Sequence, residues 1–202
     1  MTSTGDIFTG GDAIYEDLNH DGLINTSDVT YLGNANPDFF GGFYFKFSIK
    51  RNWEITSNFV FNYGNQLENL AMMNTTSVYS LNNQSTAVMR RWRQQGDITD
   101  QPRAILGMGH NFVGSDRYIQ DGSYLRCTKI GVSYNFDPKL ISRIKLRSLK
   151  IIFSVNNVYT WTKYPGVDPS VNLKLNDPYY AGRDDSRTPI PIMYSLGTTI
   201  NF

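Results

Sequence analysis

The stretch WEITSNFVFNY, residues 53–63, alternates apolar and polar side chains along most of its length. Apolar side chains recur at every second position, Trp53, Ile55, Phe59, Phe61 and Tyr63, with polar ones between them, Glu54, Thr56, Asn58 and Asn62. Only Ser57 and Val60 depart from the pattern. A period of two residues is the signal of a β-strand that presents one apolar face. The stretch therefore predicts such a strand.

Four more segments alternate in the same way and predict strands at about 41–50, 124–136, 147–161 and 192–202. Their apolar rows are Phe43, Phe45, Phe47 and Ile49; Tyr124, Ile130, Val132, Tyr134 and Phe136; Leu149, Ile151, Phe153, Val155, Tyr159 and Trp161; and Tyr194, Leu196, Thr198, Ile200 and Phe202. Aromatic residues, which strands favour, make up 14% of the chain. We therefore expect an all-β fold with antiparallel strands.

The charge and cysteine content exclude several classes of protein. Lys and Arg total 19 against 18 for Asp and Glu, so no net field draws the chain to nucleic acid. The single cysteine, Cys127, excludes an internal disulfide framework and a cysteine zinc cluster. No apolar stretch is long enough for a membrane helix. The mean hydropathy of -0.37 is compatible with a β-barrel, whose strands alternate apolar and polar residues.

The lengths of the predicted strands and of their connections favour a membrane barrel over a soluble sandwich. Eleven residues at about 3.3 Å each, tilted by about 40°, rise roughly 27 Å, close to the apolar band of an outer-membrane barrel. Aromatic residues stand at the ends of the apolar rows, where they mark membrane interfaces. Short connections alternate with long ones, residues 64–123 and 162–191. In barrels the long loops are extracellular, and we expect the same here.

Five strands are too few to close a barrel, since the smallest known have eight. The N-terminal residues, MTSTGDIFTGGD, also lack the signal peptide that an intact outer-membrane protein needs. We therefore expect a C-terminal fragment of a large transmembrane β-barrel. Residues 1–38 would form an extracellular loop, and residues 39–202 would form five barrel strands with two long outer loops.

The segment DLNHDGLINTSD, residues 17–28, has the spacing of a calcium loop. The six ligand positions are filled by Asp17, Asn19, Asp21, Leu23 through its carbonyl, Asn25 and Asp28, and Gly22 occupies the sixth position. An aspartate at the twelfth position, in place of glutamate, resembles dockerin-type loops. The alternative is a solvated turn rich in Asp, Asn and Gly. We expect calcium as the cofactor of this loop.

Catalytic machinery is absent from the sequence. The two histidines, His20 and His110, lie far apart in the chain, and each is best interpreted as a solvated loop residue. The chain has no G-x-S-x-G, no H-E-x-x-H and no phosphate-binding glycine loop. We therefore expect no enzymatic activity.

Several residues of the long loops suit contacts with sugar rings, because exposed aromatic rings stack on sugars and carboxylates bind hydroxyl groups. These candidates are Trp92, Tyr164, Tyr179, Tyr180, Asp184 and Asp185. Loop packing is the commoner role of such residues, and the sequence leaves both roles open.

Taken together, five segments resemble the C-terminal part of SusC/RagA-type TonB-dependent transporters. They are GDAIYEDLNHDGLINTSD (11–28), YLGNANPDFFGGF (31–43), RRWRQQGDITDQPR (90–103), DGSYLRCTKIGVSYNFD (121–137) and NNVYTWTKYPGVDP (156–169), followed by a last strand that ends in Phe202. The resemblance implies a 22-stranded barrel around an N-terminal plug, a TonB-binding segment and a SusD-like lipoprotein lid. It also implies an oligosaccharide cargo, or sometimes a peptide, and contact with outer-membrane lipid.

We therefore predict mainly that the chain is part of an outer-membrane nutrient importer. Without the plug and the rest of the barrel, this fragment could not transport by itself. The alternative is a soluble calcium-dependent β-sandwich that binds carbohydrate or protein. Four side chains distinguish the two, Phe45, Phe59, Phe153 and Leu196. They would fill a common core in the sandwich and form an outward band in the barrel.

Overall fold

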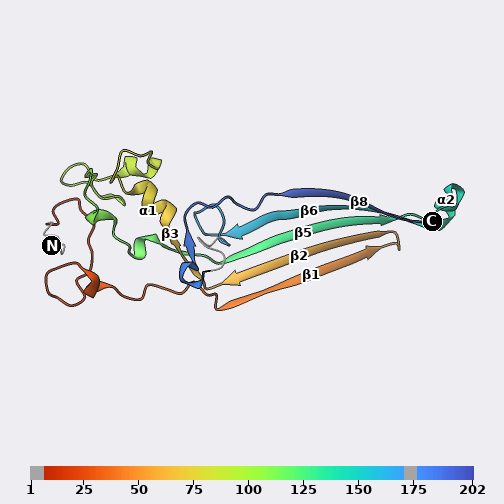
Figure 1. The fold of residues 1–202 in the computed structure, drawn as a ribbon, viewed down its shortest axis with the longest axis horizontal. Coiled ribbons are helices and arrows are strands. Elements are labelled where there is room, and N and C mark those ends of the chain that lie inside the picture. The colour runs from red at the N-terminus through yellow and green to blue at the C-terminus, as the bar shows by residue number, and fades with distance from the viewer. Residues whose placement is uncertain (1–6, 171–176) are drawn as a thin grey trace.

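The structure, a computed structural model, describes residues 7–170 and 177–202. Five long strands form one antiparallel sheet in the order β1-β2-β5-β6-β8. Their bounds are β1 Phe39–Ile49, β2 Trp53–Tyr63, β5 Tyr124–Asn135, β6 Ser148–Thr162 and β8 Met193–Asn201. The long loops gather at one end of this sheet, and the short connections and the C-terminus lie at the other (Figure 1). We call these the loop end and the short-turn end.

The connections at the short-turn end are tight. Left-handed backbone at Lys50 and Arg51 closes the hairpin between β1 and β2, in which Ile49 pairs with Trp53. Between β5 and β6 the chain forms α2, Pro138–Ile141, with Asp137 as its N-cap, and then a 3-10 turn, Ser142–Ile144. These connections bring each strand back antiparallel to its neighbour, as hairpins do.

The apolar face of the five-stranded sheet is not covered by any other part of the described chain. Phe45 is 45% exposed, Leu196 is 75% exposed, and Phe153 is also exposed. Aromatic rings pack along this face, with Phe43 stacked on Phe59 at 4.9 Å between ring centroids. A sandwich would bury these side chains under a second sheet. The sandwich alternative is therefore wrong for residues 7–170 and 177–202.

One residue lies on a different face from the one that simple alternation predicts. The pairing of β5 with β2 shifts at this point, because the consecutive residues Asn58 and Phe59 pair with Lys129 and Cys127, so that Thr128 is the additional residue of a β-bulge. Before the bulge, Leu125 pairs with Trp161 on the apolar face. Tyr124 therefore belongs to the polar face, where the guanidinium of Arg126 lies 5.2 Å from the centre of its ring. A bulge inverts the alternation, and periodicity alone does not reveal it.

The opposite face of the sheet is polar. Glu54 on β2 pairs with Lys46 on β1 at 2.9 Å and approaches Lys150 on β6 at 3.8 Å. Ser133 lies in register with Glu54 on the intervening strand β5 and is buried. The sheet thus has one apolar and one polar face, as a barrel wall requires.

The long loops form a smaller structure of their own. A three-stranded sheet has the order β4-β3-β7, with bounds β4 Ile119–Asp121, β3 Gln66–Asn69 and β7 Arg183–Asp184. Helix α1, Leu70–Thr76, follows β3 directly. Further 3-10 turns are Thr26–Asp28, Thr86–Arg90, His110–Phe112, Asp116–Tyr118 and Pro178–Tyr180. Because β3 and β7 pair in parallel, the small sheet ties the two long loops together.

Among the residues that the structure describes, no helix is both long enough and apolar enough to cross a membrane.

Candidate functional site

Asp12 anchors the segment before β1 to the long loop 64–123. Its carboxylate accepts hydrogen bonds from Arg103 Nε at 2.6 Å and Arg103 Nη2 at 2.9 Å, and from Asn111 Nδ2 at 2.8 Å. The backbone N–H of Thr9 donates to the same group at 2.8 Å. Burial raises the pKa of Asp12, but the hydrogen bonds from Arg103, Thr9 and Asn111 lower it by more, so the carboxyl stays ionised well below its usual range. The result is a buried and fully bonded carboxylate.

His110 is not the solvated loop residue that the sequence suggested. Its side chain is buried, and Nε2 lies 3.6 Å from Asp12 Oδ1, too far for a hydrogen bond. The imidazole packs edge-on against Phe8, with 5.4 Å between ring centroids. The interpretation of His110 as solvated is therefore wrong, because the segment before β1 folds over it. His20, by contrast, is exposed.

Trp92 packs against the same segment, directly before Asp12. The indole lies so close to Gly11 that a Cβ there would approach Cε3 to 2.3 Å, and Gly11 has φ +86°. Only glycine tolerates both the close approach and the left-handed backbone. The backbone N–H of Arg103 donates to the Gly11 carbonyl at 2.7 Å. Gly11 thus allows residues 7–15 to lie against the loop.

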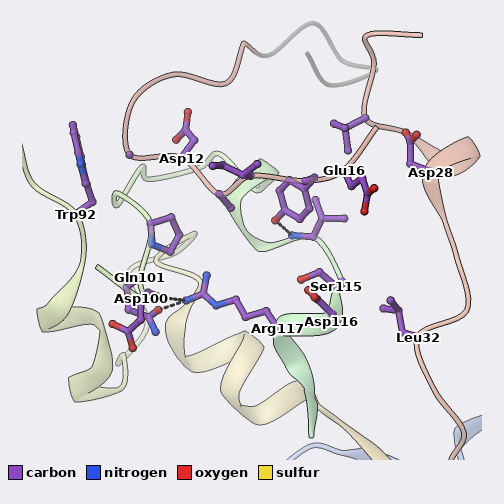
Figure 2. Close-up of a pocket in the computed structure, with 18 of the residues that line it drawn as sticks. Asp12, Glu16, Asp28, Leu32, Trp92, Asp100, Gln101, Ser115, Asp116 and Arg117 are labelled. Atoms are coloured by element: carbon purple, nitrogen blue, oxygen red, sulfur yellow. Dashed lines mark hydrogen bonds between the residues drawn. The ribbon is translucent and has the colours of Figure 1, made fainter. Parts of the chain in front are cut away.

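These contacts create a groove at the loop end, between residues 11–32 on one side and residues 92–117 on the other (Figure 2). Its volume is about 1030 Å³. Polar lining residues include Asp12, Glu16, Asp28, Asp97, Asp100, Gln101, Asp116 and Arg117, and apolar ones include Ile14, Leu18, Val29, Leu32, Trp92, Ile98 and Val113. Tyr15 closes one part of the wall, where its hydroxyl accepts a hydrogen bond from the Val113 N–H at 3.1 Å. Burial raises the pKa of this hydroxyl to about 12.

The predicted calcium loop adjoins this groove, and hydrogen bonds from its backbone to its own side chains hold its shape. Asp17 accepts hydrogen bonds from the backbone N–H groups of Asp21 and Gly22, at 3.2 and 2.7 Å. Gly22 has φ +81°, the conformation that the sharp turn at the sixth position needs. Asp28 accepts from the N–H groups of Leu18 and Asn25, at 2.9 and 2.8 Å, and so closes the loop.

The other expected ligands turn toward the inside of the same loop. Asn19 Oδ1 accepts from the N–H of Asp21 at 3.1 Å, and Asp21 Oδ1 accepts from the N–H of Leu23 at 2.8 Å. Oxygen atoms of Asp and Asn are the donors that calcium prefers. Within residues 7–170 and 177–202, however, no three carboxylate, imidazole or thiol groups come together as a metal cluster. The oxygen donors of this loop are therefore of the kind that calcium prefers, although its carboxylates do not form a cluster in the structure.

The six candidate sugar contacts occupy different environments. Tyr164 and Asp184 are buried and bonded to each other, with the phenol donating to Asp184 Oδ2 at 2.6 Å. Burial and this hydrogen bond raise the pKa of Tyr164. Tyr179 is 89% exposed, and Asp185 is exposed beside Asn74 Nδ2 at 3.3 Å. Trp92 lines the groove, and Tyr180 lies 5.8 Å from the guanidinium of Arg183. The structure does not bring these six residues together, and their role in sugar contact stays a prediction.

A second buried pair escaped the sequence analysis. Arg126 donates to Asp168 through Nη2, to Ser170 Oγ at 3.0 Å and to Thr160 Oγ1 at 2.8 Å. Burial raises the pKa of Asp168, but hydrogen bonds from Ser170 and Arg126 lower it by more. The pair fixes the loop after β6 to the polar face of the sheet. The only signal in the sequence was an arginine within a strand pattern, which does not identify its partner.

No family model matches the chain, but it is similar in sequence to several TonB-dependent receptors. It is 28% identical over 205 residues to TonB-dependent receptor P3 of Formosa agariphila, covering 100% of this chain and 20% of that receptor. It is 24% identical over 200 residues to TonB-dependent receptor SusC of Bacteroides thetaiotaomicron, covering 94% of this chain and 17% of SusC. The chain thus spans about a fifth of the length of these relatives.

Solved structures show the same fold. The RagAB peptide importer in its closed-closed state superposes with a TM-score of 0.71 at 21% identity, over 84% of this chain and 18% of that one. The open-open state of RagAB gives a TM-score of 0.65. The resemblance to SusC/RagA-type TonB-dependent receptors is therefore confirmed, and so is the fold class of antiparallel strands from a larger barrel. The lengths are consistent with a C-terminal fragment.

Proposed function

We propose that this chain, a relative of SusC/RagA-type TonB-dependent receptors, forms part of the barrel of an outer-membrane nutrient importer in a Gram-negative bacterium. The observation that carries the proposal is similarity to such receptors along the whole chain, together with the matching fold. The importer would take up oligosaccharides, would be covered by a SusD-like surface lipoprotein and would be driven through TonB. The chain itself would supply wall and loops, and no catalytic step.

The two faces of the sheet support this role. The apolar face, with Phe45, Phe153 and Leu196 exposed, would contact lipid, and the polar face with Glu54 would face the interior. In this orientation the loop end is extracellular, because long loops of such barrels point outward. The loop end would then meet both the cargo and the lipoprotein, with Tyr179 and Asp185 among the exposed candidates for sugar contact.

The proposal is tested in cells that carry or lack the full-length receptor. We expect the receptor in the outer-membrane fraction, and we expect growth on oligosaccharides of the cognate glycan to be lost when the gene is deleted. Growth on the corresponding monosaccharide should be unchanged, which controls for general fitness. A receptor in the soluble fraction, or a deletion strain that grows normally on every oligosaccharide and peptide supplied, would contradict the proposal.

We also propose that residues 17–28 bind calcium through Asp17, Asn19, Asp21, Asn25, Asp28 and the carbonyl of Leu23. Support comes from the oxygen donors and from Gly22, which allows the turn. Calcium would draw the separated carboxylates together and brace the loop beside the groove. Hydrogen bonds from the loop amides already orient Asp17 and Asp28.

Calorimetry of the purified full-length receptor tests the calcium proposal. We expect heat on titration with calcium, and we expect Asp21→Ala to remove it. Asp185→Ala, on the same end of the molecule but outside the loop, is the matched control and should leave the heat unchanged. If the wild-type receptor gives no calcium heat, the loop is a solvated turn.

A further inference from the structure

We propose that the groove between residues 11–32 and 92–117 docks a basic, aliphatic segment of the partner lipoprotein. The inference rests on the function proposed above, because it requires such a partner at the loop end, and it adds the chemistry by which the partner is held. The first support for it is the charge of the lining.

Six carboxylates line the groove against a single guanidinium, that of Arg117. Two of them are neutralised within the chain, since Asp12 pairs with Arg103 and Asp100 pairs with Arg90. Of the four others, Asp28 belongs to the proposed calcium loop, which leaves Glu16, Asp97 and Asp116. Three carboxylates facing one guanidinium leave the groove acidic, so an occupant with lysine or arginine side chains is favoured.

Aliphatic side chains stand between these carboxylates without any cover in the described chain. Ile14 is 99% exposed and Ile98 is fully exposed, and Val29 is also exposed. Exposed apolar side chains that gather at a groove with a polar rim mark sites of interaction. An occupant that carries both aliphatic and basic side chains matches this lining, and a polypeptide segment supplies both.

The aromatic rings of the groove are already engaged, which disfavours a sugar as occupant. The Trp92 indole lies against the backbone of Gly10 and Gly11. The Tyr15 hydroxyl accepts from Val113, and its ring packs against Phe8 at 5.9 Å between centroids. Stacking on a sugar ring requires a free aromatic face. The groove offers mainly aliphatic surface and carboxylates in their place (Figure 2).

The size of the groove suits an anchor segment. A volume of about 1030 Å³ lies at the upper end of pockets that take drug-sized ligands. A few residues of a polypeptide fit such a space, while the rest of a protein interface would surround it. Interfaces are commonly dominated by a few residues seated in a central pocket.

The test measures association of the full-length receptor with its lipoprotein partner at low and high salt. The first variant, Glu16→Gln with Asp116→Asn, removes two charges from exposed side chains that make no hydrogen bond or ion pair in the described chain. The second, Ile14→Ser with Ile98→Ser, removes the aliphatic surface. Controls are Asp38→Asn and Leu81→Ser, which alter an exposed charge and a 91% exposed leucine outside the groove.

We expect the charge variant to slow association about tenfold at low salt, with the difference shrinking at high salt. The aliphatic variant should speed dissociation about tenfold, and both controls should stay within about twofold of the wild type. The peptide acetyl-Lys-Leu-Arg-Leu-amide should compete with the partner, and its acidic counterpart acetyl-Glu-Leu-Asp-Leu-amide should not.

The failures are distinguishable. If the wild-type receptor binds the lipoprotein and the groove variants bind equally well, the groove inference is overturned and the proposed function stands. Competition by maltohexaose in place of the basic peptide would identify a sugar site and overturn the inference as well. If the wild-type receptor forms no complex at all, the proposed partnership fails together with the inference.

Discussion

Substitution of Asp12 by alanine should release the segment before β1 from the long loop. The Asp12 side chain is 1% exposed and accepts two hydrogen bonds from Arg103, one from Asn111 and one from Thr9. Removing one partner of a buried ion pair typically costs about 3–5 kcal/mol. Arg103 is one-third exposed and keeps part of its hydration, so we expect about 3 kcal/mol for Asp12→Ala. That energy corresponds to roughly a hundredfold faster local opening.

Hydrogen exchange of the full-length receptor measures this opening directly. The amides of Ala13 and Arg103, which are bonded across the contact, should exchange about a hundredfold faster in the variant, by the same conversion. Asp100→Ala is the matched control, because Asp100 also forms an ion pair with an arginine, Arg90, but both of these side chains are exposed. It should change exchange little. Equal acceleration by the two variants would refute the idea that burial makes the Asp12 pair strong.

The same contact predicts how pH acts on the segment. The pKa of Asp12 is lowered in the folded protein, so its stabilisation is complete above the unfolded value of about 3.9 and is lost as the pH falls further. Protection of these amides, corrected for intrinsic exchange, should therefore be constant from about pH 5 to 8 and weaken below about pH 4. Loss of protection near neutral pH would contradict this assignment.

Three further predictions concern other contacts. Gly11→Ala should loosen the groove, because φ at Gly11 is +86° and Trp92 leaves no space for a Cβ atom. The control is Gly96→Ala, where φ is +97° and nothing lies within 4 Å, so that the substitution adds only backbone strain. Equal loss of hydrogen-exchange protection at the Arg103 amide in the two variants would refute the packing argument. Tyr164→Phe should destabilise the pairing of β3 with β7 by about 1–3 kcal/mol, because the buried Oδ2 of Asp184 loses its donor while Oδ1 keeps the N–H of Ser186. An unchanged exchange rate at the Glu68 amide would count against this prediction. Leu196→Arg should destabilise the full-length receptor in bilayers by about 2–4 kcal/mol if the apolar face meets lipid. Thr199→Arg, on the polar face, should not have this effect. Equal unfolding midpoints for the two variants would contradict the proposal that the apolar face contacts lipid.

The strands were predictable from sequence because each is specified by its own residues. Trp53 to Tyr63 alternates without help from distant parts of the chain, and the strand begins and ends at those residues. Tyr124 was assigned to the wrong face because the bulge at Thr128 depends on pairing with β2, which the sequence of β5 does not contain. Local pattern thus predicts the strand, and only the partner strand determines its register.

The candidate site was less predictable for a related reason. Its contacts join residues far apart in the chain, such as Asp12 with Arg103 and Arg126 with Asp168. A lone Asp or Arg in a loop carries no sign of its partner, so the groove and the burial of His110 were missed. The calcium loop was found because all six of its expected ligands lie within twelve consecutive residues.

Burial differs between the five-stranded sheet and the long loops, and this difference connects the fold to its proposed role. Along the strands, large apolar side chains such as Phe47 and Leu196 are exposed, while in the loops the polar side chains of Asp12, Asp168 and Asp184 are buried and bonded. A sheet that meets lipid needs no apolar core on that face. The long loops bury apolar side chains such as Leu67, Val88 and Phe112, and buried polar contacts order them as well, because breaking any one of these contacts leaves an unpaired group. Asp12 and Arg126 therefore order the loop end, which would present the groove to the proposed partner as a preformed surface.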